Sequence, residues 1–215
     1  MADGKKEPAP FAITIGRQFG SGGRELGRLI ASRLGIDYYD KELLIESARL
    51  AGVNPEFFEK NDERFPTFLN GLFSFSMGFS PMAYYTGSSA ISGDGLYKSL
   101  SDFLLATIRE KSFVVVGRSA DYILRDNPRC VNIFVHAPME ACVDRITARA
   151  DVADRSKAKA LAEKTNRLRA DFYNFYTDKT WGHSASYDLT VDSSKMPMED
   201  IAGIVVEYIR KRLDL

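Results

Sequence analysis

The chain has 215 residues, of which 45% are apolar and 27% charged, and its 29 basic and 29 acidic side chains give a net charge of zero. This composition suits one domain with a sizeable core and argues against a surface that coats nucleic acid. Two cysteines exclude a disulfide framework and a four-cysteine zinc site. No stretch has the roughly 20 apolar residues of a membrane span, and none reads as a signal peptide. We therefore expect a soluble, cytoplasmic protein that does not bind membranes.

The first part of the chain predicts a strand, a helix, a second strand and a second helix. Residues 1–10 predict a disordered tail, and the apolar run 11–15 ends in glycines, which is typical of a buried parallel strand. From Arg24 to Leu34 apolar residues recur every three or four positions, and Gly35 ends this amphipathic helix. Residues 36–40 predict the second strand, and 41–51 the second helix.

The rest of the chain continues the alternation. Strands are predicted at 112–116, 131–135 and 187–191, and helices at about 96–110, 138–150, 157–176 and 198–212. Five strands alternating with helices indicate an α/β fold with a mostly parallel sheet, in a single domain over 11–215. The segment 64–95, rich in Phe, Met, Ser and Gly, fits neither period. It predicts a packed insertion, a substrate-side lid or a partner surface, or else irregular helices that complete the core.

A glycine-rich loop between the first strand and the first helix carries most of the functional information. Backbone N–H groups at a helix start can surround a phosphate where glycines remove the side chains, and flanking arginines add charge. The alternative is a strand-to-helix turn that serves only close packing. The candidate phosphate-binding residues are Arg17, Gly20, Ser21, Gly22, Gly23, Arg24 and Glu25.

Two known phosphate-binding patterns match this loop only in part. If Gly22 takes the second glycine of G-x-x-x-x-G-K-[ST], Arg17 stands at its first glycine and Gly23 at its lysine. The dinucleotide pattern G-x-G-x-x-G fails at Glu25. An acid follows at Asp40, at about the spacing of a ribose-binding residue, so a dinucleotide site stays a minor alternative.

Four segments together resemble the cytidylate kinase-like family of P-loop proteins, in the right order over nearly the whole chain from Phe11. These segments are 13–25, 38–43, 116–121 and 187–194. The resemblance implies a three-layer P-loop kinase fold with a helical lid at about 145–175 and a helical acceptor-binding insertion at about 64–95. It also implies ATP-dependent phosphoryl transfer to a nucleoside monophosphate, CMP or dCMP, with ATP and Mg²⁺ as cofactors and small nucleotides as the binding partners.

The loop departs from the family pattern at the residues that matter for transfer. Gly23 replaces a lysine that neutralises phosphate charge, and Glu25 replaces a threonine that orients Mg²⁺. Arg24 could restore the charge, and Glu25 could face the triphosphate through a metal ion, which makes it the candidate metal ligand. Asn174 stands where the family tends to have a further arginine. Two alternatives follow: a nucleotide-binding module with weak or lost catalysis, or a kinase for another small metabolite.

The resemblance also assigns acceptor-binding residues. Arg118 follows a strand of valine and phenylalanine, where the family places an arginine that binds the acceptor phosphate. A basic residue beyond a strand's carboxyl end lies in the ligand crevice of an open α/β sheet, which favours a binding role for Arg118. The alternative is a surface arginine at a helix start. Asp40 matches an acidic position near the monophosphate and could accept a hydrogen bond from the ribose or the base.

The stretch 145–169 is basic, with eight basic side chains against three acidic ones. The resemblance implies a lid whose arginines, Arg145, Arg149 and Arg167, stabilise phosphate charge as it closes over the site. Asp171 lies four residues after Arg167 and would be held by it. The alternatives are a solvated helix face and a nucleic-acid patch, the second weak because aromatic residues are not interleaved. The sequence does not indicate an oligomeric state.

Overall fold

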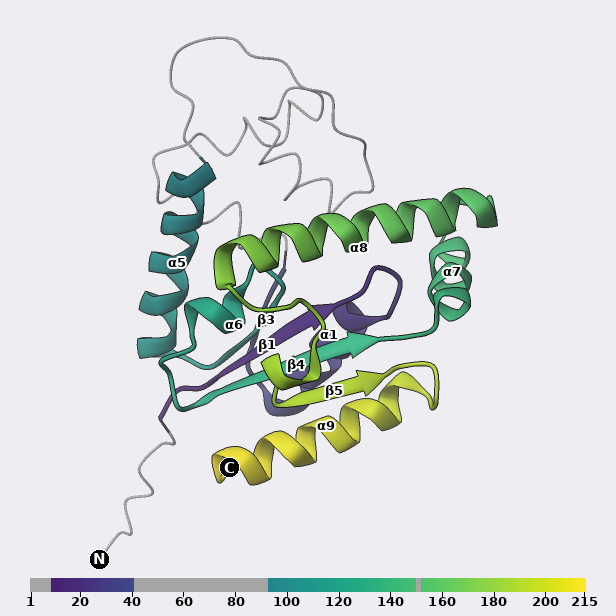
Figure 1. Ribbon diagram of the computed structural model, residues 1–215. Helices are drawn as coiled ribbons and strands as arrows, with labels where there is room; N and C mark the ends of the chain where they lie inside the picture. Colours follow the sequence, from purple (N-terminus) through teal and green to yellow (C-terminus); the bar gives the residue numbers. More distant parts are fainter. Residues whose placement is uncertain (1–8, 41–92, 150–151) are drawn as a thin grey trace, which may run out of the picture.

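The computed structural model describes residues 9–40, 93–149 and 152–215, and the remaining residues are drawn as a grey trace (Figure 1). The predicted helix at 41–51 lies outside the described residues, as do almost all of the predicted tail at 1–10 and of the predicted insertion at 64–95.

Five parallel strands form the centre of the molecule in the order β2-β3-β1-β4-β5 (Figure 1). The chain leaves β1 toward β2 and β3 on one side and later crosses to β4 and β5 on the other. Ligand crevices of open α/β sheets lie at the carboxyl ends of the strands at such a switch point. The strands are β1 (Ala12–Arg17), β2 (Asp37–Tyr39), β3 (Phe113–Val116), β4 (Cys130–His136) and β5 (Leu189–Asp192).

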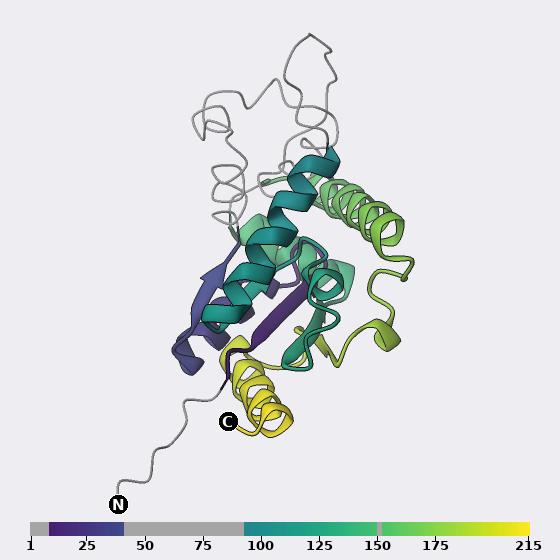
Figure 2. The same ribbon diagram turned by 90° about the vertical axis from the view of Figure 1, so that its left-hand side faces the viewer.

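Helices cover both faces of the sheet and make a three-layer α/β arrangement (Figures 1 and 2). Alternate side chains of the central strands pack against α1 and α9 on one face and against α5 and α6 on the other, while α7 packs on α8. The helices of the described residues are α1 (Gly23–Leu34), α5 (Gly93–Glu110), α6 (Ala120–Ile123), α7 (Met139–Ala148), α8 (Arg155–Thr177) and α9 (Met198–Leu213), with a short 3₁₀ turn η1 at Ser184–Ser186.

The structure confirms the predicted α/β class and the five strands, with small shifts at their ends. The last strand begins at Leu189 rather than at Tyr187. Before it, the N–H of Asp188 donates to the carbonyl of Asn132 over 2.8 Å, and the Asp188 carboxylate accepts from the Asn132 N–H over 2.7 Å. These bonds attach the chain to β4 ahead of the strand, so the ring of Tyr187 is placed by the loop and not by the strand.

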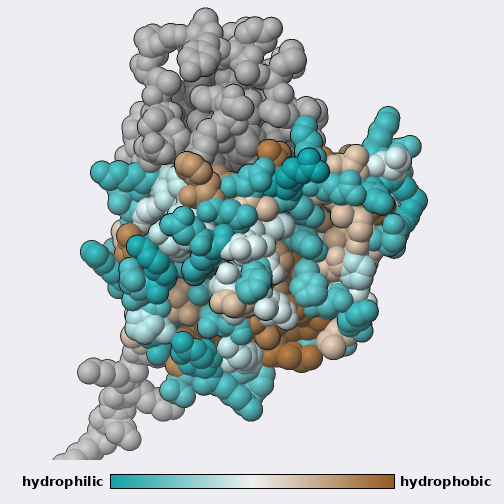
Figure 3. All heavy atoms as spheres, viewed as in Figure 1, coloured by the Kyte–Doolittle hydropathy of each residue, from teal (hydrophilic) through white to brown (hydrophobic). Residues whose placement is uncertain are grey.

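The interior and the surface of the described residues agree with the composition. Both cysteines, Cys130 and Cys142, are buried as core thiols. Hydrophilic side chains cover most of the face seen in Figure 3, with apolar ones in small separate groups. Among the described helices, none combines the length and the apolar content that crossing a membrane requires.

Candidate functional site

The glycine loop joins the end of β1 to the start of α1 and uses its glycines for both conformation and space. Gly20 and Gly22 have φ of 81° and 84°, a left-handed region that other residues rarely adopt. A Cβ at residue 20 would lie 2.6 Å from the carbonyl oxygen of Cys142, and one at residue 22 would collide with the methyl group of Met198. The loop is thus tightly packed against Cys142 at Gly20 and against Met198 at Gly22.

Hydrogen bonds from several elements fix the loop. Buried Ser21 places its Oγ 2.9 Å from the carbonyl oxygen of Gln18 and 3.0 Å from that of Val135. The Ser193 hydroxyl donates to the carbonyl of Ser21 over 2.6 Å, and Arg145 donates to the Oγ of Ser193 over 3.1 Å. The Ser21 hydroxyl, through its own bonds, and Arg145, through Ser193, therefore stabilise the loop.

The start of α1 has the geometry of an anion site. Its first intrahelical bond runs from the N–H of Leu26 to the carbonyl of Gly22 over 3.0 Å, so the N–H groups of Gly23, Arg24 and Glu25 precede the helical ladder. These N–H groups and the positive end of the helix dipole favour a negative charge at this point. The glycine loop thus leads into a helix start, and phosphate binding there stays a prediction.

Three consecutive residues after β3 have positive φ, and the turn is strained at the two that are not glycine. Gly117, Arg118 and Ser119 have φ of 78°, 66° and 50°, and the last two have side chains that disfavour such values. Backbone strain of about 1–3 kcal/mol per residue persists where the surrounding structure enforces it, often at functional sites. The turn buries the side chain of Arg118, which is 9% exposed, at the end of β3. The Oγ of Ser119 is buried and has no hydrogen-bond partner among the described residues.

Four arginines from different elements gather around one carboxylate. Arg17 ends β1, Arg24 lies in the first turn of α1, Arg118 follows β3 and Arg169 comes from α8. Asp40, which follows β2 and is 3% exposed at its side chain, accepts from the Nε of Arg24 over 2.7 Å. Burial lowers the pKa of Arg17 to about 10 and that of Arg118 to about 9, and the neighbouring guanidiniums lower both while Asp40 opposes them. Burial and the same neighbours also lower the pKa of Arg169. These guanidiniums lower one another's pKa because their charges lie close together, so an anion bound among them would relieve the repulsion.

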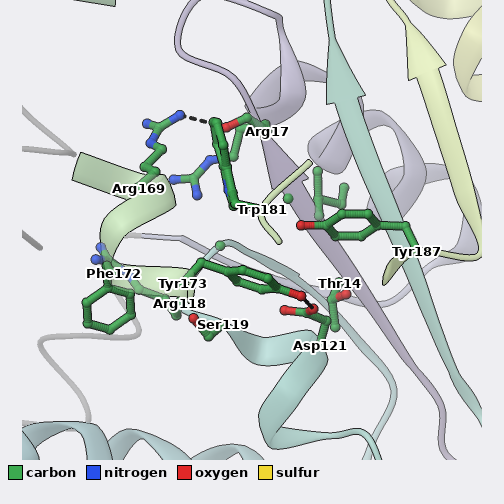
Figure 4. A pocket seen from close by; sticks show the side chains of 13 residues that line it. Thr14, Arg17, Arg118, Ser119, Asp121, Arg169, Phe172, Tyr173, Trp181 and Tyr187 are labelled. Atoms are coloured by element: carbon green, nitrogen blue, oxygen red, sulfur yellow. Dashed lines mark hydrogen bonds between the residues drawn. The ribbon is translucent and has the colours of Figure 1, made fainter. Parts of the chain in front are cut away.

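A pocket lies beside this cluster, between the sheet and α8 (Figure 4). Arg17 and Arg169 lie close together beside Trp181 in Figure 4, and Arg118 also lines the pocket. The ring of Tyr187 forms another part of the lining. At the opposite end, the hydroxyl of Tyr173 donates to the Oδ2 of Asp121 over 2.6 Å. The pocket thus combines cations at one end with aromatic walls and a buried carboxyl at the other.

Helix α8 is fastened to the site by three side chains along one stripe. Asn166 accepts from the N–H of Phe19 over 2.7 Å, Arg169 donates to the carbonyl of Arg17 over 2.9 Å, and Tyr173 reaches Asp121. Sequence reasoning counted Arg169 among the basic residues but did not place it in the site. The signal for it was the spacing of the buried positions on α8, which are Ala158, Ala162, Thr165, Tyr173 and Thr177, because Arg169 lies on the same face.

The other residues predicted for a lid lie away from the arginine cluster. Arg149 caps the C-terminus of α7 and is exposed, and Arg167 and Asp171 are exposed on α8. In the described part of the chain no ion pair connects Arg167 with Asp171, so the expected pairing is not present. Arg145 lies beside Gly22, with its Nε 3.8 Å from where a Cβ of that residue would be. Of the predicted lid arginines, the structure therefore brings Arg145 to the glycine loop.

The carboxylates near the loop fit Mg²⁺ only in part. Glu25 is exposed in the first turn of α1, next to the predicted phosphate position. The Ser21 hydroxyl faces two carbonyl groups and is not placed to bind a metal ion. Within the described ranges no three His, Cys, Asp or Glu side chains group as a metal centre. Mg²⁺ in kinases is held by one or two carboxylates and mainly by the nucleotide phosphates, and Glu25 is the side chain here that fits this limited role.

Solved structures with this fold include several kinases. An uncharacterized protein from Eubacterium ventriosum ATCC 27560 is 26% identical, with a TM-score of 0.69 and coverage of 93% of this chain and 98% of that one. A gluconokinase from Sinorhizobium meliloti 1021 is 14% identical, with a TM-score of 0.55 and coverage of 97% and 96%. A shikimate kinase from Acinetobacter baumannii, solved with shikimate, is 14% identical, with a TM-score of 0.50 and coverage of 94% of each chain. The similarity confirms the predicted P-loop kinase fold.

Family membership follows from the sequence and not from these distant structural matches. No curated protein matches the chain. The model of the cytidylate kinase-like family matches residues 12–195, which include the glycine loop, the strained turn and the whole of α8. The resemblance found in the sequence is thereby confirmed, and the chain belongs to the cytidylate kinase-like family.

Proposed function

We propose that the chain transfers the γ-phosphoryl group of ATP to a nucleoside monophosphate, CMP or dCMP. The observation that carries the proposal is the cluster of Arg17, Arg24, Arg118 and Arg169 beside the glycine loop, at the carboxyl edge of the sheet. Phosphoryl transfer requires positioning and charge stabilisation more than covalent chemistry, and these arginines can provide both. Membership of the cytidylate kinase-like family supports the reaction class.

On the donor side, the loop from Gly20 to Arg24 would hold the phosphates of ATP. The N–H groups that precede the ladder of α1 would donate to phosphate oxygens, as helix starts do at anion sites. Glu25 would be the side chain that holds Mg²⁺, and the metal ion would supply positive charge at the phosphates of ATP. Arg145 would keep the loop in shape through Ser193.

On the acceptor side, the strained turn and the pocket would hold the monophosphate. Arg118 would bind the acceptor phosphate, and the buried hydroxyl of Ser119 would gain the hydrogen-bond partner that the described residues do not give it. The aromatic walls at Tyr173, Trp181 and Tyr187 suit a planar ring such as a nucleobase. Asp40 would keep Arg24 in place through their 2.7 Å contact.

In the reaction, an oxygen of the acceptor phosphate forms a bond to the γ-phosphorus of ATP. The bond between that phosphorus and the β,γ-bridging oxygen breaks, and its electron pair leaves with ADP. The acceptor oxygen is already anionic at neutral pH, so no side chain has to remove a proton. The arginines would stabilise the charge on the transferred group.

A coupled assay of ADP formation with CMP, dCMP, UMP and AMP tests the proposal. We expect turnover with CMP or dCMP and a loss of about 100-fold in kcat/KM for Arg118→Ala. Arg210→Ala, at an exposed arginine on α9, is the matched control and should act like the wild type. Turnover with none of these acceptors while ATP still binds would refute the reaction. That result would favour a binding module or a kinase for another metabolite, because the loop lacks the usual lysine.

A further inference from the structure

Compared with phosphate loops that carry a lysine, this loop has a cation, Arg17, where they have a glycine, and a glycine, Gly23, where they have the lysine. With Gly22 as the second glycine of the G-x-x-x-x-G-K pattern, Arg17 holds the place of the first glycine and Gly23 that of the lysine. In the structure the two residues are in contact. A Cβ at residue 23 would lie 2.6 Å from the Cβ and 3.0 Å from the Cγ of Arg17. The stem of Arg17 therefore runs through the space where a side chain at residue 23 would begin.

The guanidinium of Arg17 continues from the loop to the acceptor side of the crevice. It lies over Gly117, where a Cβ would collide with its Nη1. Gly117 has φ of 78° and precedes Arg118 in the strained turn. The charge of Arg17 is therefore held between the glycine loop at Gly23 and the residue proposed to bind the acceptor phosphate. In the proposed reaction, the phosphoryl group would cross this interval during transfer.

Electrostatics favour Arg17 over Arg24 as the cation for that group. Arg24 contacts the carboxylate of Asp40 at 2.7 Å, which offsets its charge. Arg17 lines the pocket, and burial is the main reason that its pKa falls to about 10. A protonated guanidinium that is held out of water beside other cations destabilises the folded protein, and a bound anion offsets this destabilisation.

We propose that Arg17 supplies, from the strand before the loop, the positive charge that a lysine on the loop supplies in other P-loop kinases. Arg17 would bind the transferred phosphoryl group directly, and Gly23 would be glycine because the stem of Arg17 fills its side-chain space. This inference rests on the proposed function, since it assigns a role in phosphoryl transfer.

The substitution Arg17→Gln tests the charge and keeps the stem that packs on Gly23. Two measurements apply: calorimetric binding of inorganic tripolyphosphate, and kcat for ADP formation with the acceptor that the wild type uses. We expect Arg17→Gln to weaken tripolyphosphate binding by at least about 10-fold and to lower kcat by about 100-fold. Arg17→Lys should recover most of the binding, and Arg210→Gln should act like the wild type in both measurements.

The double substitution Arg17→Gly with Gly23→Lys tests the exchange itself. Arg17→Gly removes the stem that fills the side-chain space of residue 23, so a lysine can be placed there. The double variant should therefore bind tripolyphosphate more tightly than Arg17→Gly alone. This comparison of the double variant with Arg17→Gly also tests the role of Arg17 if Arg17→Gln does not fold. The inference is overturned if Arg17→Gln, or the exchange relative to Arg17→Gly, leaves tripolyphosphate affinity within about twofold. Absence of turnover in the wild type, with binding still dependent on Arg17, would refute the proposed function but not the phosphate contact.

Discussion

The carboxyl group of Asp121 lies buried below the pocket, where the hydroxyl of Tyr173 donates to it over 2.6 Å. Burial raises the pKa of Asp121, and the bond from Tyr173 opposes that rise. A carboxyl whose folded pKa is raised favours folding most at low pH, and this contribution is lost as pH rises through the folded pKa. Each unit of difference corresponds to about 1.4 kcal/mol.

Asp121→Asn removes this titration and keeps an acceptor for Tyr173. We expect the variant to gain in the free energy of unfolding, relative to the wild type, between pH 4 and the folded pKa of Asp121, with no further change above it. Urea unfolding at a series of pH values measures the difference. Asp37→Asn should show the opposite trend, because the ion pair with Lys111 lowers the pKa of Asp37 and its contribution is lost as pH falls. Identical pH profiles for the two variants would contradict the opposite directions of the pKa shifts at Asp121 and Asp37.

The contact between Gly23 and Arg17 predicts that Gly23→Ala changes the free energy of unfolding in opposite directions with and without Arg17. Gly23→Ala should destabilise the wild type by about 1–3 kcal/mol, because the new Cβ overlaps the stem of Arg17. With Arg17→Gly in the background, the same substitution should stabilise by about 0.5 kcal/mol, because alanine has less chain entropy to lose. The double-mutant cycle from urea unfolding measures the coupling. Equal effects in the two backgrounds would show that the stem does not occupy this space.

At the residue scale, the sequence reveals a site residue best where a strand ends. Arg118 and Asp40 could be proposed from the sequence because Arg118 comes two residues after the predicted strand 112–116 and Asp40 ends the predicted strand 36–40. Carboxyl ends of parallel strands meet at one edge of the sheet. Arg169 and Asp121 could not be proposed, because their positions depend on how α8 and α6 pack on the sheet. Arg167 and Arg169 are two residues apart on a helix and so face different ways, which the local charge count does not distinguish.

At the element scale, a hydrogen bond at Asn166 fastens α8 to the glycine loop. Asn166→Ala would leave the N–H of Phe19 without its acceptor, which lies 2.7 Å away. We expect a loss of about 1–2 kcal/mol in the free energy of unfolding and weaker tripolyphosphate binding, because this bond helps to hold the loop.

Asn174→Ala, also on α8, is the matched control for this substitution. Its side chain accepts from the N–H of Trp181 at an exposed position, where water can replace it, so the loss should stay below about 0.5 kcal/mol. Urea unfolding and calorimetry of both variants test the difference. A smaller effect at Asn166 than at Asn174 would mean that α8 does not support the loop.

Most of the described elements could be predicted because their patterns are local. The central strands are short apolar runs, and α1 and α9 have one clear apolar face. Boundaries shifted where long-range bonds decide them, as at Asp188 before β5. The ends of α8 matched within two residues of the prediction, and its N-cap is set by Asp154, whose side chain accepts from the N–H of Lys157 over 2.7 Å.

At the scale of the whole molecule, a formal charge of zero conceals a strongly positive site. The repulsion among the four arginines opposes folding, so an anion that binds between them should stabilise the protein. Tripolyphosphate at 100 times its Kd should add about 2.7 kcal/mol to the free energy of unfolding, and thus raise the melting temperature. The gain should fall in 0.5 M sodium chloride and in Arg118→Ala. An equal gain in Arg118→Ala and the wild type would place the anion elsewhere.

The central claim is that donor and acceptor phosphates meet where the glycine loop adjoins the arginine cluster. Crystals grown with ADP and CMP test it most directly. We predict β-phosphate oxygens of ADP at about 3 Å from the N–H groups of residues 22–24, and the phosphate of CMP against the guanidinium of Arg118. Nucleotide phosphates bound away from both the loop and Arg118 would contradict the account.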